Sequence, residues 1–355
     1  MKLRRMLTII GLSVLVIALF STSAGCQKSA ENKQIKIFAV SPFEDQYFAT
    51  WLDGAKAAAK LLNIDLTSGT AESDPSKQND LIQSAVSAGA QGVLVARVDL
   101  DAFLPLARQL DAKAVAIVTT DGPVSNGPRL AHFAADDMAL GKELGTLLME
   151  GLAKSGKPKP WYIVAFAGLP GTYAGMTRVE GALAAMSASI AKGDIVMGST
   201  QIANFDRQTA FEKMQAILTN NHKIDGVFAA NDDMTFGAMK ACEAAGLVSG
   251  KDTIFVGIDV IPDAVNAITQ GKEYGSISQA PYLEGYWGVT TLYAYLEYGI
   301  KPDSVGMPVP TVAVTKENVN NFTATIKYDK PVPAEDFATY KDKYQTFVQK
   351  FWPNS

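Results

Sequence analysis

The side chains best suited to chemistry in this chain follow its short apolar runs. They stand in segments 43–48 (Phe-Glu-Asp-Gln-Tyr-Phe), 120–122 (Thr-Asp-Gly), 168–173 with Arg178 behind it, 204–206 (Asn-Phe-Asp) and 231–233 (Asn-Asp-Asp), at Asp259 and at Gln279. Carboxylates, amides, a guanidinium and aromatic rings together suit a neutral polyhydroxylated ligand. The rings cover C–H patches of a sugar, and the polar groups hydrogen-bond its hydroxyls. These residue types favour carbohydrate binding.

Catalysis on a carbohydrate is the main alternative at the level of chemistry. Asp45, Asp121 and Asp259 could form a glycosidase pair, because hydrolases use the same residue types and the sequence does not report the distance between carboxylates. The glycine-rich segment 168–171 has neither a following Gly-Lys-Ser/Thr nor the Rossmann spacing, and no nucleophile elbow occurs. Two histidines without a Cys/His cluster predict no transition-metal site. We expect neither enzymatic activity nor a cofactor.

Apolar runs alternate with amphipathic segments along most of the chain. Strands are predicted at 35–40, 64–66, 91–96, 114–119, 161–167, 226–229, 254–258 and 275–278. Helices are predicted at 48–62, from Ser73-Asp74-Pro75 onward, and at 101–110, 136–154, 176–190, 207–219, 232–245 and 261–270. This alternation predicts parallel sheets buried on both faces, and such sheets bind ligands beyond the carboxyl ends of their strands.

Composition and size limit the class of protein. The 48% hydrophobic and 19% charged content is that of a globular chain. A net charge of −4 argues against a nucleic-acid partner and gives no attraction to anionic lipid. Without the predicted leader about 330 residues remain, more than a single core usually holds, so two lobes are expected.

The first 26 residues predict export. Lys2, Arg4 and Arg5 precede an apolar run that ends in Ser-Ala-Gly-Cys at 23–26, which is typical of a secretory signal and resembles a lipobox. We expect a lipid on Cys26 and a polar tether over 27–34. An ordinary cleaved signal with a chance cysteine is the alternative. With Cys26 lipidated, Cys242 has no partner for an internal disulfide.

Five segments form an ordered set of motifs. They read Tyr-Phe…Asp-Gly-Ala (47–55), Gly-Thr…Arg…Glu-Gly (171–181), Asn-Phe-Asp (204–206), Val-Phe-Ala-Ala-Asn-Asp-Asp-Met (227–234) and Val-Gly-Ile-Asp (256–259). From about Ile35 to Thr315 this set resembles the ribose/galactose-type periplasmic sugar-binding proteins, the solute receptors of bacterial ABC importers.

The resemblance implies a type I periplasmic binding protein, with two similar doubly wound α/β lobes joined by three hinge strands and the sugar between them. The N-terminal lobe would comprise 35–135 plus 280–310, and the C-terminal lobe 136–279 plus 311–355, with hinges near 135–136, 279–280 and 310–311. Carried over by position, the ligand-binding residues are Asp45, Tyr47, Phe48, Asp121, Arg178, Phe205, Asn231, Asp259 and Gln279. Tyr47 and Phe205 would sandwich the sugar ring.

Plainer roles stay open for several of these residues. Asp121 and Asp259 could only cap the elements that follow them, and Tyr47 and Phe205 could be core residues. Asp232 and Asp233 are expected to cap the next helix, and we expect a satisfied core histidine at position 132.

The chain departs from the family pattern in its N-terminal lobe. Gly122 stands where ribose-type members carry an Arg, and Asp45 replaces their Asn, as in galactose/glucose-type members. Arg97 occupies a position that is usually Asn. We predict that Arg97 enters the cleft, contributes to ligand binding and pairs with Asp121 or Asp45. Alternatively, Arg97 points to solvent and Gly122 makes room for a bulkier sugar.

The sequence therefore predicts a monomeric, membrane-anchored receptor that delivers a monosaccharide or polyol to ABC permease subunits. A sensor that reports sugar occupancy to a membrane kinase or chemoreceptor is the other binding role. Aromatic residues recur at helical spacing near the C-terminus and predict a last helix docked on a lobe, with a partner surface as the alternative. They are Phe337, Tyr340, Tyr344, Phe347 and Phe351.

Overall fold

The computed structural model describes residues 34–123, 126–170, 172–220, 223–302 and 304–321. The predicted signal segment with Cys26, nearly all of the predicted tether and the predicted C-terminal helix lie outside these residues. No helix in the described ranges is long and apolar enough to cross a membrane.

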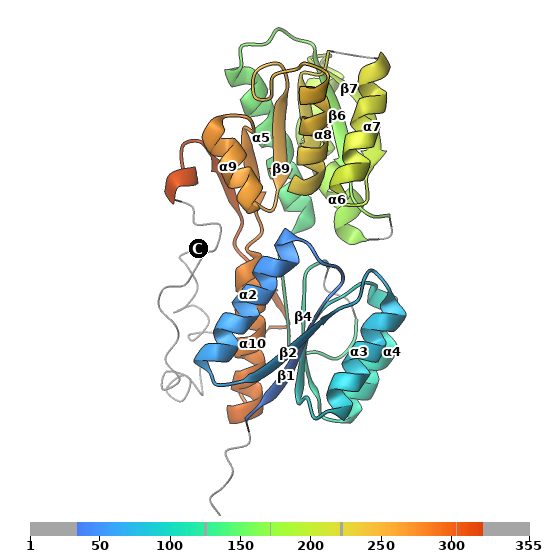
Figure 1. Cartoon of the computed structure of the whole chain (residues 1–355), viewed down its shortest axis with the longest axis vertical. Helices are drawn as coiled ribbons and strands as arrows, with labels where there is room; N and C mark the ends of the chain where they lie inside the picture. Colours follow the sequence, from blue (N-terminus) through green and yellow to red (C-terminus); the bar gives the residue numbers. More distant parts are fainter. Residues whose placement is uncertain (1–33, 124–125, 171, 221–222, 303, 322–355) are drawn as a thin grey trace, which may run out of the picture. The chain divides into compact units, whose positions relative to one another are not determined.

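Two six-stranded sheets organise the chain (Figure 1). In spatial order, the first contains β11 (Gly306–Pro308), β5 (Ala131–Ala134), β4 (Ala116–Thr120), β3 (Gly92–Ala96), β1 (Lys36–Ser41) and β2 (Asp65–Thr70). The second contains β12 (Val312–Thr315), β10 (Gly275–Ser278), β9 (Ile254–Ile258), β8 (Gly226–Ala229), β6 (Trp161–Ala167) and β7 (Ile195–Ile202). Neighbouring strands are parallel except β10 and β12. The predicted fold of two parallel-sheet α/β lobes is confirmed.

Helices cover both faces of each sheet. Because successive residues of a strand point to opposite faces, alternate side chains pack against different helices. In the N-terminal lobe, α2 (Gln46–Leu61) and α10 (Pro281–Tyr298) cover one face, and α3 (Pro75–Ser87) and α4 (Leu100–Ala112) cover the other (Figure 1). Ile37 belongs to the cluster on the first face and Phe38 to the cluster on the second. The C-terminal lobe repeats this arrangement with α5 (Asp137–Lys154) and α6 (Tyr173–Ala191) on one face and α7 (Arg207–Asn220) and α8 (Asp232–Ala244) on the other. The helix α9 (Pro262–Gln270) and the short η1 (Val319–Asn321) share a small cluster with β12.

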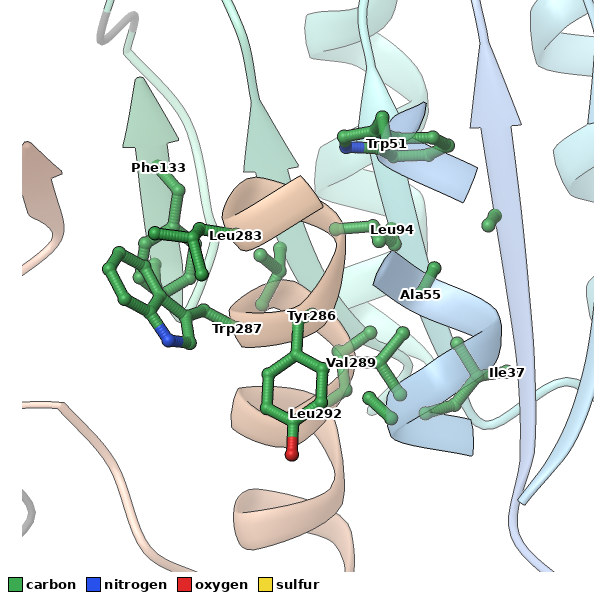
Figure 2. Packing of buried hydrophobic residues seen from close by; sticks show 14 of the residues in the cluster. Ile37, Trp51, Ala55, Leu94, Phe133, Leu283, Tyr286, Trp287, Val289 and Leu292 are labelled. Atoms are coloured by element: carbon green, nitrogen blue, oxygen red, sulfur yellow. The ribbon is translucent and has the colours of Figure 1, made fainter. Parts of the chain in front are cut away.

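The helix α10 was not predicted from the sequence, because it has no polar face. Every residue from Pro281 to Leu292 is buried, so the amphipathic period that marks a surface helix is missing. Figure 2 shows side chains of α10 beside Leu94 and Phe133, and Trp51 belongs to the same cluster. A Cβ on Gly285 would lie 1.9 Å from the carbonyl oxygen of Trp51, so only glycine allows α10 to approach α2 this closely.

The chain passes between the two sheets at three places within the described residues. These are the segment between β5 and α5, the segment 279–280 between β10 and α10, and the segment 309–311 between β11 and β12. Ala280 has φ 51°, a left-handed conformation that is unfavourable for a residue with a Cβ. The assignment of whole domains to these boundaries stays a prediction.

Two buried carboxyl groups converge on Gly257 in β9. A Cβ there would lie 2.1 Å from Oδ1 of Asp232 and 3.2 Å from Oε1 of Glu273. Asp232 accepts hydrogen bonds from the Ser276 hydroxyl (2.7 Å) and the Ile261 N–H (3.0 Å). Neither carboxyl oxygen of Glu273 has a hydrogen-bond partner in the described part of the chain. Burial, with Asp232 nearby, raises the pKa of Glu273 well above its ordinary value.

Replacing Glu273 with Gln should stabilise the fold more at pH 8 than at pH 5, by about 1–3 kcal/mol. Above about pH 4.3 the unfolded chain releases a proton that the folded chain retains, so the carboxyl group lowers the free energy of unfolding as the pH rises. Gln keeps the shape without ionising. Urea unfolding at both pH values measures the effect, with the exposed Glu150→Gln as control. Equal effects of Glu273→Gln at the two pH values would contradict this explanation.

Candidate functional site

A cavity of about 920 Å³, counting the solvent at its mouth, lies at strand ends of both sheets. All candidate ligand-binding residues from the sequence lie on its wall: Asp45, Tyr47, Phe48, Arg97, Asp121, Arg178, Phe205, Asn231, Asp259 and Gln279. Their contact with a ligand stays a prediction.

A buried guanidinium fixes one wall of the cavity. Nε of Arg178 donates to Asp137 (2.7 Å), Nη1 donates to the carbonyl oxygen of Ala230 (2.9 Å), and Nη2 donates to Oε1 of Gln279 (2.9 Å). A Cβ on Gly141 of α5 would lie 2.2 Å from the carbonyl oxygen of Arg178, so the close approach of α5 and α6 sets this geometry. Three of the five guanidinium N–H groups are used in these bonds, which leaves two for other acceptors.

The charge of Arg178 is stabilised by its neighbours. Burial opposes the charge, but the carboxylates of Asp137, Asp259 and Asp121 outweigh burial and raise the pKa of Arg178. The amide of Gln279 continues the network, because its Nε2 donates to Oδ1 of Asp259 at 2.6 Å. Burial raises the pKa of Asp259 well above its ordinary value although Arg178 acts against it. The result is a connected series of fixed donors and acceptors on the wall.

The N-terminal lobe contributes two further carboxyl groups. Asp45 caps α2 by accepting the N–H of Phe48 at 2.7 Å, and Asp121 follows β4. Burial raises the pKa of Asp45 to about 7. The hydrogen bond from the Phe48 N–H opposes this rise, and the charges of Asp233 and Asp121 add to it. Burial also raises the pKa of Asp121, while Arg178 lowers it. Both groups would be stabilised as carboxylates by new hydrogen-bond donors, such as ligand hydroxyls.

The side chains of Arg97 and His132 hold the loop after β4 through its carbonyl oxygens. Nη2 of Arg97 donates to the carbonyl oxygens of Pro123 (2.8 Å) and Asp121 (3.4 Å), and Nε2 of His132 contacts the carbonyl oxygen of Gly122 at 2.9 Å. Burial lowers the pKa of Arg97 to about 10, and the charge of Asp121 acts against this fall. The predicted pairing of Arg97 with Asp121 or Asp45 stays a prediction. Gly122 has φ 67°, a left-handed conformation that favours glycine.

Aromatic rings form the apolar part of the wall. The rings of Tyr47 and Phe48 meet edge to face at 5.0 Å in the first turn of α2. The Phe205 ring lies on Gly168, where a Cβ would come within 2.1 Å of its Cζ atom. Phe205 has φ 60° and Asp259 has φ 118°, and strained backbone of this kind collects at functional sites.

The structure corrects one sequence prediction and adds one residue. The prediction that Asp232 and Asp233 cap the helix α8 is wrong. Oδ1 of Asn231 caps α8 by accepting the Met234 N–H at 3.0 Å. Sequence reasoning missed Asp137, the partner of Arg178, because the contact depends on the packing of α5 against α6. Its only sequence signal is a second Asp after Asp136 at the start of a predicted helix.

Arg178→Met should lower the free energy of unfolding by about 3–5 kcal/mol, because it leaves the carboxylate of Asp137 buried without its cation. Adding Asp137→Asn to that variant should restore part of the loss. The control is Arg207→Met, whose pairs with Asp233 and Asp263 are half-exposed and should contribute at most about 1 kcal/mol. Urea unfolding measures all of these variants. Similar losses for the two arginines would mean that Arg178 does not anchor the wall as a buried charge.

Comparison with known proteins gives the family. The sequence model described as a periplasmic binding protein domain matches residues 36–301. The ribose import binding protein of Escherichia coli is 28% identical over 276 residues, 78% of this chain and 89% of that protein. The xylitol-binding protein of Mycolicibacterium smegmatis is 28% identical over 304 residues, 84% of this chain and 82% of that protein.

A solved structure is similar over the whole fold. The periplasmic solute-binding protein of an Actinobacillus succinogenes ABC transporter, determined with bound D-allose, has a TM-score of 0.74 and 25% identity, and the match covers 82% of this chain and 100% of that one. The chain belongs to the periplasmic binding protein family, and its resemblance to the ribose/galactose-type members is confirmed.

Proposed function

We propose that this protein is an exported receptor that binds a monosaccharide or polyol in the cavity and delivers it to an ABC importer. The observation that carries the proposal is the fixed network of Arg178, Gln279 and Asp259, which faces a cavity that also holds the aromatic ring of Phe205. Such a combination orients hydroxyls and covers the apolar faces of a sugar.

The relatives support this ligand class and this partner. Two of them are named for ribose import and for xylitol, and the similar structure of an ABC transporter solute-binding protein holds D-allose. Pentoses, polyols and hexoses are therefore the compounds to screen first. Both named relatives are binding proteins, which agrees with binding without turnover.

Ligand capture would proceed by hinge closure, the motion known for periplasmic binding proteins. A ligand that contacts residues of both lobes favours the closed form by the difference between its affinities for the two forms. Asp45 and Asp121 would act from one lobe, and Arg178 and Asn231 from the other. The ABC permease would then recognise the closed form.

A thermal-shift screen tests the binding function. At a concentration one hundred times its dissociation constant, the ligand should add about 2.7 kcal/mol to the free energy of unfolding. Phe205→Ala should weaken binding by about 1–2 kcal/mol through lost stacking. Gly168→Ala should weaken binding similarly, because its methyl group displaces the Phe205 ring, and the double variant should lose no more than Phe205→Ala alone.

The exposed Val248→Ala serves as the control in the same titrations. Additive losses in the double variant would show that Gly168 does not act through the Phe205 ring. Recovery of a chemically altered sugar after incubation with catalytic amounts of protein would show that the protein is an enzyme and would overturn the receptor function.

The proposal includes a lipid anchor on Cys26, supported by the Ser-Ala-Gly-Cys sequence after an apolar run. Wild-type protein expressed in a bacterium should partition with membranes, and Cys26→Ser should not, because acyl chains supply the anchor. Cys242→Ser is the matched control, since it removes the other cysteine. Fractionation with mass spectrometry of the mature N-terminus measures the result. Soluble, unmodified wild-type protein would exclude the anchor.

A further inference from the structure

The wall of the cavity also includes five apolar side chains besides the aromatic rings of the sugar-facing network. We call them the apolar compartment: Phe43, Val98, Leu100, Leu169 and Tyr173. The first three belong to the N-terminal lobe, whereas Leu169 lies between β6 and α6 and Tyr173 begins α6 in the C-terminal lobe. The apolar compartment therefore includes residues of both lobes and belongs to the same cavity as the residues of the proposed function.

The polar groups beside the apolar compartment are largely engaged within the protein. The hydroxyl of Thr172 donates to the carbonyl oxygen of Leu169 at 2.7 Å, and the carboxylate of Asp99 caps α4 by accepting the Ala102 N–H at 2.7 Å. Ser73 adds one exposed hydroxyl to the wall. A second sugar unit would need several hydrogen-bond partners at this wall, whereas an apolar group needs none.

An apolar group, in contrast, would gain by leaving water for this wall. Tyr173 is 49% exposed, and Phe43, Val98, Leu100 and Leu169 are each partly exposed. Covering exposed apolar surface with an apolar ligand group is favourable in proportion to the area removed from water. A free monosaccharide held by Arg178 and Asp259 carries no such group.

Building on the proposed function, we propose that the preferred ligand is a sugar or polyol that carries an apolar substituent, such as an alkyl or aryl glycoside. The sugar part occupies the polar network, and the substituent fills the apolar compartment. Affinity then comes from both parts, while orientation comes from the hydrogen bonds of the polar part.

Calorimetric titration with matched pairs tests this inference. The probes are ribose, galactose and glucose, each beside its butyl and phenyl glycosides in both anomers. In at least one pair the glycoside should bind at least tenfold more tightly than the free sugar. Leu100→Ser and Tyr173→Ser should each reduce this ratio at least fivefold, and Val248→Ser, at an exposed position away from the cavity wall, should leave the ratio unchanged. Circular dichroism and melting temperature establish that each variant is folded.

The outcomes separate this inference from the proposed function. If free sugars bind as tightly as their glycosides or more tightly, the inference fails and the receptor function stands. If the glycosides bind more tightly but neither Leu100→Ser nor Tyr173→Ser lowers the ratio, the substituent does not occupy the apolar compartment and the inference also fails. If no sugar or glycoside binds, the proposed function fails and the inference fails with it.

Discussion

Arg178 carries a charge that the interior of the C-terminal lobe could not hold alone, and its partners connect the cavity to the passages between the sheets. Asp137 begins α5 directly after one passage, and Gln279 lies at another. A movement of either segment would disturb a buried hydrogen bond to a charged group, which is costly. The same guanidinium that faces the cavity therefore constrains two of the segments that connect the two sheets.

The cavity wall concentrates unfavourable features that a well-packed core avoids. The pKa values of Asp45, Asp121 and Asp259 are all raised by burial, and Asp121, Phe205 and Asp259 have left-handed backbone. The rest of the two lobes must stabilise this arrangement, as is common where a site is preorganised for a ligand. New hydrogen-bond donors from a ligand would stabilise these groups as carboxylates.

Sequence reasoning succeeded where a local pattern decides the outcome. Apolar runs followed by polar residues located most strands, and the rule that ligands lie beyond strand ends brought the candidate residues to one wall. Long-range packing decided the rest. The pairing of Asp137 with Arg178 requires the glycine contact between two helices, and α10 lacks the polar face that would reveal it. The entry of Arg97 into the cavity wall was predicted, but its peptide-oxygen partners depend on the left-handed turn at Gly122.

The position of α10 in the chain has a consequence for the order of folding. One face of the N-terminal lobe is completed by α10 at 281–298 and β11 at 306–308, whereas the C-terminal lobe has all of its strands except β12 by residue 278. More than two hundred residues separate α2 from α10. As the chain emerges from a ribosome or a translocation pore, α2 therefore has no partner helix until these residues have followed it. We expect the C-terminal lobe to collapse first, with the exposed face of α2 as the surface that a chaperone must cover in the interval.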